Sequence, residues 1–97
     1  MPAYLIARIS VQDAAGFDRY RAAVLPVIAV HGGHYIVRGG AMDVLEGTSP
    51  ERVVIVEFPT MDAARGFYHS PDYAPLLTLR MQSTESEVML VEGYPPG

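Results

Sequence analysis

The order of strand-like and helix-like segments constrains the fold of this chain more than any single residue does. Residues 52–58, RVVIVEF, are rich in β-branched side chains and predict a strand. Residues 3–10, AYLIARIS, residues 33–38, GHYIVR, and residues 87–93, EVMLVEG, predict three more. Because 97 residues suffice for one domain, these four strands are expected to belong to a single structural unit.

Residues 14–31, between the first two predicted strands, show helical periodicity. Asp13 precedes this segment, where a helix cap belongs, and Gly32 or Gly33 offers the left-handed conformation that ends a helix. Pro26 lies inside the segment and predicts a kink. The apolar residues that recur at helical spacing are Phe17, Tyr20, Val24 and Ile28.

A second helical region follows residues 52–58. Thr60 is expected to cap it, and Ser70 with Pro71 is expected to start a second short piece, which Pro75 closes. Residues 81–86, MQSTES, are expected to form a loop.

The order is therefore βαββαβ. With right-handed crossovers it predicts an α+β ferredoxin-like domain over residues 1–97, with a four-stranded antiparallel sheet and two helices on one face.

The Gly39-Gly40 pair interrupts an otherwise strand-forming run and has two structural interpretations. It is either a two-residue hairpin turn or a bulge that bends one long strand continuing through residues 41–46, AMDVLE. The bulge is preferred, because residues 47–51, GTSPE, make the better turn and directly precede the third strand. In either case a positive φ angle is expected at one of the two glycines.

Side chains on a strand alternate between faces, so each strand presents two sets of residues. The set expected to face the helices is Leu5, Ala7, Ile9, Tyr35, Val37, Val54, Val56 and Phe58. The set expected on the opposite face is Tyr4, Ile6, Arg8, His34, Ile36, Arg38, Val53, Ile55 and Glu57. The second set is too apolar for a face in water, and such surfaces usually contact a partner. We therefore expect a homodimer that packs sheet against sheet.

Composition excludes several classes of function. The chain has no cysteine and no lysine, which excludes thiol chemistry and a lysine Schiff base. A net charge of −4 without a basic run argues against nucleic acid and anionic membranes, and no apolar run approaches the length of a membrane span. The first ten residues, MPAYLIARIS, lack the features of a signal peptide, so a cytoplasmic location is expected.

Several longer motifs occur in an order that resembles a known family. GGHYIVRGG, EFP and FYHSPDY follow one another at residues 32–40, 57–59 and 67–73, and LVEG closes the last predicted strand. The pattern resembles the family called domain of unknown function 1330, within the dimeric α/β-barrel superfamily. In this chain His34 stands where a basic residue such as arginine is common, and Pro75 interrupts the last helical turn.

The resemblance implies a ferredoxin-like subunit that dimerises through its sheet. It implies no established reaction, because the family is named for lacking one. Relatives in the superfamily include cofactor-free monooxygenases, lactone isomerases and chlorite-degrading haem proteins, so the resemblance implies a small-molecule site by analogy.

Arg38 is the strongest candidate for a functional residue. It follows an apolar strand and precedes the glycine pair, and its guanidinium suits a carboxylate or phosphate group of a small anionic metabolite. An ion pair with an acidic residue of either subunit is the structural alternative. The further candidates for ligand binding are His34, Tyr20 and Tyr73, although tyrosines on helices also serve as core residues.

No metal or cofactor is expected. His31 and His34 are three residues apart, but the glycines between them change the backbone from helix to strand, and no carboxylate or cysteine is near in sequence. Two functions remain open: a cofactor-free enzyme, of the monooxygenase or isomerase kind, that acts on a small molecule, or a non-catalytic dimer that binds a ligand or a protein.

Overall fold

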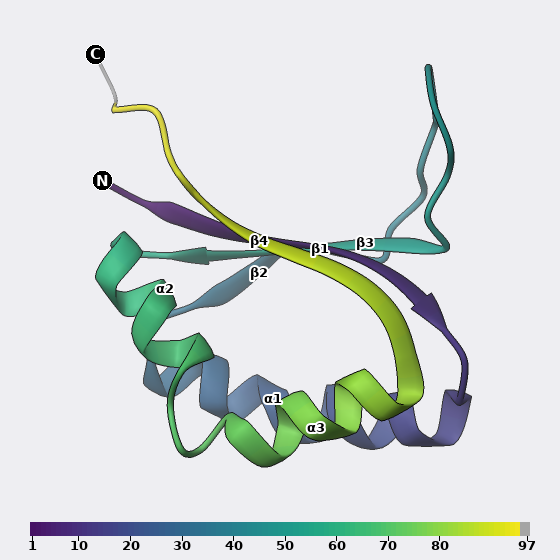
Figure 1. Cartoon of the computed structure of the whole chain (residues 1–97). Coiled ribbons are helices and arrows are strands. Elements are labelled where there is room, and N and C mark those ends of the chain that lie inside the picture. The colour runs from purple at the N-terminus through teal and green to yellow at the C-terminus, as the bar shows by residue number, and fades with distance from the viewer. Residues whose placement is uncertain (96–97) are drawn as a thin grey trace.

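The computed structural model describes residues 1–95, and Figure 1 shows its arrangement of one sheet and a layer of helices. The strands are β1 (Ala3–Val11), β2 (His34–Arg38), β3 (Arg52–Phe58) and β4 (Thr84–Glu92). The helices are α1 (Ala14–Val30), α2 (Met61–Tyr68) and α3 (Ala74–Ser83).

The four strands form one antiparallel sheet in the order β2-β3-β1-β4, and the helices cover one of its faces (Figure 1). The predicted α+β ferredoxin-like fold is confirmed, with its second helical region divided into α2 and α3. The core lies between the sheet and the helices, where alternate residues of β1 and β3 are buried against α1 and α2. We call this side of the sheet the helix face and the opposite side the free face.

Helix α1 begins and ends as the sequence predicts. The Asp13 side chain accepts a hydrogen bond from the backbone N–H of Gly16 at 3.2 Å, and the helix continues through Pro26. Gly32, with φ at +80°, follows its last turn. Helix α2 likewise begins after Thr60, whose hydroxyl accepts from the N–H of Ala63 at 3.0 Å.

The junction of α3 and β4 differs from the prediction. Pro75 does not close a helix but lies in the first turn of α3, where a backbone N–H has no partner within the helix. Residues 81–86 are not a loop, because the helix runs directly into the strand. The hydroxyls of Ser83 and Thr84 donate to the carbonyls of Leu79 and Arg80, each at 2.7 Å, so side chains satisfy the end of the helix.

Strand β2 also differs from the prediction, and the difference bears on the site. It is short, and its register against β3 shifts by one residue at Ile36. Gly39 has the expected positive φ, at +70°, but it follows the last residue of the strand. Residues 39–51 contain no strand and extend from the sheet on the side away from the helices (Figure 1). The bulge is therefore at Ile36, and the prediction that a bulge at Gly39-Gly40 carries the strand on to residue 46 is wrong.

Within residues 1–95, none of the helices combines the length and the apolar character that crossing a membrane requires.

A candidate ligand pocket between the sheet and the helices

The register shift in β2 places Arg38 on the helix face. Arg38 pairs with Val54, which shares its face of β3 with Val56 and Phe58 in the core. The guanidinium carbon of Arg38 lies 4.5 Å from the centroid of the Tyr35 ring, which belongs to the same face. The prediction that Arg38 faces away from the helices is thus wrong, and Val37 takes the place on the free face instead.

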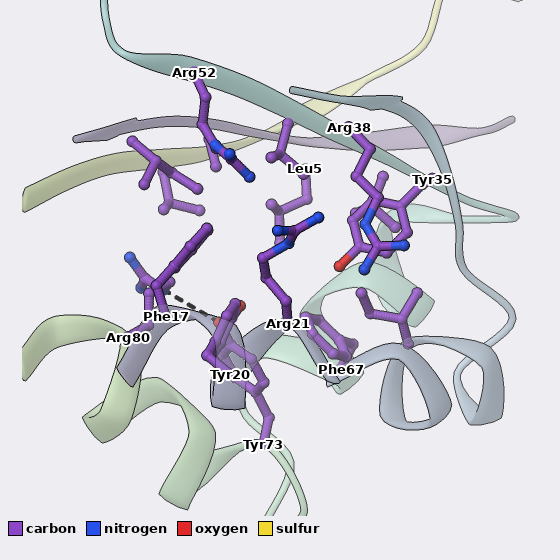
Figure 2. Close-up of a pocket in the computed structure, with 16 residues that line it drawn as sticks. Leu5, Phe17, Tyr20, Arg21, Tyr35, Arg38, Arg52, Phe67, Tyr73 and Arg80 are labelled. Carbon is purple, nitrogen blue, oxygen red and sulfur yellow. Dashed lines mark hydrogen bonds between the residues drawn. The ribbon is translucent and has the colours of Figure 1, made fainter. Parts of the chain in front are cut away.

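A pocket lies between this face and the helices (Figure 2). It holds about 530 Å³ of space free of protein atoms, its open mouth included. Strands β1 and β3 and helix α1 supply most of its apolar wall. The polar side chains that line it are Tyr20, Arg21, Tyr35, Arg38, Arg52, Tyr73 and Arg80.

Arginine dominates the polar lining, which contains four of the seven arginines of the chain and no aspartate or glutamate. Arg21 approaches Asp18 at 3.8 Å on the surface, and no acidic side chain within residues 1–95 pairs with the other three. The Nε atoms of Arg21 and Arg52 are buried and have no hydrogen-bond partner in the described chain. The pocket is therefore strongly electropositive in a protein whose net charge is −4.

Arg80 lies at one end of the pocket and anchors a chain of hydroxyl groups. Its Nε donates to the Tyr73 hydroxyl at 3.3 Å, which lies 2.8 Å from the Tyr20 hydroxyl. Its terminal nitrogens donate to the hydroxyls of Ser86 and, at 3.3 Å, Tyr68. All three nitrogens of this guanidinium thus have partners within the protein.

Burial and close neighbours shift the pKa values of three side chains in the pocket, Tyr20, Tyr35 and Arg80. Burial, and then the neighbouring Tyr73, raise the pKa of Tyr20 well above the ordinary value for tyrosine, so its hydroxyl stays neutral. Burial also raises the pKa of Tyr35, although Arg38 acts in the opposite direction. Burial lowers the pKa of Arg80, but the neighbouring hydroxyls of Tyr73, Tyr20 and Tyr68 together outweigh it and leave the pKa of Arg80 raised. The pocket therefore combines a fixed cation with neutral hydroxyl groups.

Arg52 is a residue of the pocket that the sequence analysis missed. Its guanidinium carbon lies 5.1 Å from the centroid of the Phe17 ring. Gly39 lies against it, because a Cβ atom at that position would be 3.4 Å from the guanidinium carbon. Arg52 shares the every-second-residue spacing of Val54 and Val56 along β3, so the rule that assigned those residues to the helix face applies to it as well.

Arg21 and Arg80 were missed for a different reason. Arg21 follows Phe17 by one helical turn on α1, and Arg80 lies seven residues after Tyr73, two turns along the same face of its helix. An inner helix face defined by apolar residues alone does not include arginines that share the same helical spacing.

The structure brings together three of the four residues predicted from the sequence. Tyr20, Arg38 and Tyr73 line the same pocket. His34 lies on the free face, where its Nε2 is 3.0 Å from a carboxylate oxygen of Glu57. The Tyr4 hydroxyl donates to the other oxygen of that carboxylate at 3.4 Å. His34 thus belongs to a separate polar cluster.

The free face carries apolar side chains, and no helix within residues 1–95 covers them (Figure 1). They are Ile6, Val37, Val53, Ile55, Met89 and Val91. The arm of residues 39–51 adds the exposed side chains Met42, Val44 and Leu45. Within residues 1–95, histidine and acidic side chains form no group of three or more suited to a metal ion.

Comparison with solved structures finds several proteins of the same fold. The RPA0582 protein of unknown function from Rhodopseudomonas palustris has a TM-score of 0.77 and 19% identity, over 98% of this chain and 84% of that one. SnoaB, a cofactor-independent oxygenase from Streptomyces nogalater, has a TM-score of 0.70 and 22% identity, over 98% and 95%. A dimeric ferredoxin-like protein of unknown function from Thermobifida fusca has a TM-score of 0.66 and 17% identity, over 96% and 92%.

At these identities the likeness establishes the fold alone. No protein of curated function is similar enough in sequence to match the chain. The family described as Domain of unknown function (DUF1330) matches residues 2–94. Because that match spans nearly the whole sequence, the chain belongs to the DUF1330 family.

Proposed function

We propose that the protein is a homodimer that binds one small organic molecule in the inner pocket of each chain. The observation that carries this proposal is the pocket itself, which has apolar walls and several polar side chains that converge on one space. Small-molecule sites typically have this composition.

Self-association through the free face is the second part of the proposal. The apolar side chains there surround Ile55, which pairs with Ile6 and Val37 on the neighbouring strands. A second copy would cover this surface, and several solved relatives of the same fold are described as dimeric. In such a dimer the two inner pockets lie on the outer, helix-covered sides of the paired sheets. The cytoplasmic location expected from the sequence stays a prediction.

Native mass spectrometry of the gently purified protein tests both parts. We expect twice the chain mass, with bound small molecules that are released on denaturation. Val54→Phe provides the control for the site, because its larger ring takes up room in the pocket lining while the free face is unchanged. A monomer would contradict the dimer. The pocket assignment would be contradicted if no compound co-purifies or binds from a metabolite library, or if Val54→Phe, still folded, keeps the bound compound.

Catalysis without a cofactor is a second candidate function, and the hydroxyl chain favours it. Tyr20 presents a neutral hydroxyl that is linked through Tyr73 to the cation of Arg80. Such a group can donate a hydrogen bond to an oxygen atom that gains negative charge during a reaction. The oxygenase activity of SnoaB, a protein of the same fold, makes oxygen uptake the first activity to measure.

The catalytic candidate predicts that a compound bound in the pocket is converted over time. Tyr20→Phe should then slow conversion while leaving the affinity for the compound nearly unchanged. Recovery of every bound compound unaltered, in the presence of oxygen, would leave ligand binding as the function.

A further inference from the structure

We infer that the ligand of the inner pocket is a small planar organic anion, an aromatic or conjugated carboxylic acid, whose carboxylate lies between Arg52 and Arg38. The inference rests on the proposed function, because it assumes that the pocket is a small-molecule site, and it specifies the chemical class of the molecule bound there.

The first argument is charge. Guanidinium groups keep their charge at any accessible pH, and cations held in a partly dry pocket are unfavourable without a counter-charge. The chain has eleven acidic residues, yet none of them lines the pocket. Arg38, Arg52 and Arg80 thus have no acidic partner within residues 1–95, so a bound anion is attracted and a cation is excluded.

The second argument is the set of free hydrogen-bond donors. Arg80 already donates to Tyr73, Tyr68 and Ser86, so it supports the wall and leaves little for a ligand. Arg52 has a buried Nε without a partner. No acidic side chain in the described part of the chain pairs with Arg38. The buried Nε is out of reach, but no side-chain hydrogen bond within residues 1–95 uses the terminal nitrogens of Arg52 or Arg38, so these nitrogens are the donors left for a ligand.

The third argument is the orientation of those donors. The guanidinium of Arg52 lies over the Phe17 ring, and that of Arg38 lies over the Tyr35 ring. A guanidinium that rests on an aromatic ring keeps its N–H edge free, and this edge matches the two oxygens of a carboxylate. Figure 2 shows Arg52, from β3, and Arg21, from α1, extending from opposite walls into the space beside Arg38.

The fourth argument is the rest of the lining. Beyond the arginines and tyrosines, the wall consists of aliphatic and aromatic side chains, including Leu5, Phe17 and Phe67. Inorganic phosphate would satisfy the arginines but leave this apolar wall unused, whereas a ring-sized body buries against it. An aromatic acid therefore fits the pocket better than a free inorganic anion.

The test is an NMR titration of the ¹⁵N-labelled dimer with matched acids and amides: benzoate and benzamide, 2-naphthoate and 2-naphthamide, and inorganic phosphate. Backbone amide shifts locate each compound. In the wild type we expect the acids to shift pocket residues and to bind at least roughly tenfold more tightly than the amides or phosphate, because only the acids combine charge-assisted pairing with an apolar body.

The variants Arg52→Gln and Arg38→Gln should each weaken binding of the acids by roughly tenfold and change binding of the amides by less than about twofold. Arg65→Gln is the matched control, because Arg65 is an exposed residue of α2 that pairs with Asp62 on the surface. It should leave every affinity within about twofold. Two arginine variants are used so that the result does not depend on one of them folding.

Three results would overturn the inference: amides or phosphate that bind as tightly as the acids, arginine variants that keep the preference for acids, or acids that shift only residues outside the pocket. If amides bind in the pocket and acids do not, the anion inference fails while the proposed small-molecule site stands. If no compound binds in the pocket, both fail.

Discussion

Arg38 lies opposite Val54 across the β2–β3 pair, whereas an unbroken register from His34 onward would place it opposite Val53. The difference of one residue turns its side chain from the free face to the helix face. Ile36 is the residue at which the register shifts. The backbone of one short edge strand thus decides whether the guanidinium lies in the inner pocket or on the proposed dimer surface.

Substitution of an arginine that binds a ligand should affect stability differently from substitution of an arginine whose hydrogen bonds stabilise the fold. Arg38→Met and Arg52→Met remove cations that lack an acidic partner in the described chain, so the free energy of unfolding should stay the same or rise. Arg80→Met leaves Tyr73, Tyr68 and Ser86 without their donor and should lower it by about 1–3 kcal/mol. Urea unfolding of the three variants measures this. Equal losses in all three would contradict the distinction.

The two adjacent glycines after β2 should respond differently to alanine. Gly39 has φ at +70°, so Gly39→Ala should lower the free energy of unfolding by about 1 kcal/mol or more. Gly40 is not among the glycines with positive φ, and a Cβ there would meet nothing within 4 Å. Gly40→Ala should therefore change stability by less than about 0.5 kcal/mol. Denaturation curves that show the same effect at both positions would be inconsistent with this backbone geometry.

The sequence predicts the sheet well because β1 and β3 alternate regularly. Their inner residues, such as Leu5 and Val56, were assigned to the correct face by counting every second position. The same count fails in β2, because Ile36 is a good strand residue and nothing in its identity indicates that the register shifts there. The face of Arg38 depends on how two strands pair, which the pattern of one strand does not contain.

The helices show a second limit of pattern reading. Pro75 was interpreted as the end of a helix, but proline is also common in the first turn of a helix, where Pro75 lies. The polar run from Met81 to Ser86 was interpreted as a loop by composition. In the structure the hydroxyls of Ser83 and Thr84 bond to carbonyls of the last helical turn. The pocket arginines Arg21 and Arg52 were recoverable from spacing alone, since they follow the same periodicities as their apolar neighbours.

Stability at high pH should report the burial of Tyr20. Burial raises the pKa of this hydroxyl, so the folded protein keeps the proton at pH values where the unfolded chain, with an ordinary pKa of about 10, loses it. The contribution to stability is fully present below about pH 10 and is lost as the pH rises further. Tyr20→Phe lacks this group and should lose less stability between about pH 9 and 11 than the wild type does. Urea unfolding at each pH checks this, and equal losses would contradict it.

The proposed dimer depends on the apolar free face. Ile55→Asp places a carboxylate among Ile6 and Val37 and should dissociate or unfold the protein, because an unpaired buried charge costs several kcal/mol. Leu25→Asp makes the same change at an exposed apolar position of α1, away from this face, and should leave the dimer intact. Sedimentation equilibrium at micromolar concentration distinguishes the species. A wild-type monomer, or an Ile55→Asp variant that remains a dimer, would contradict the proposed interface.

The most direct test of the account as a whole is a crystal structure of the wild-type protein grown with saturating 2-naphthoate. The account predicts Arg38 on the helix face and the carboxylate within hydrogen-bonding distance of both Arg38 and Arg52, with the ring system against the apolar wall of the pocket. An empty inner pocket, or a naphthoate bound on the free face beside His34 and Glu57, would contradict it.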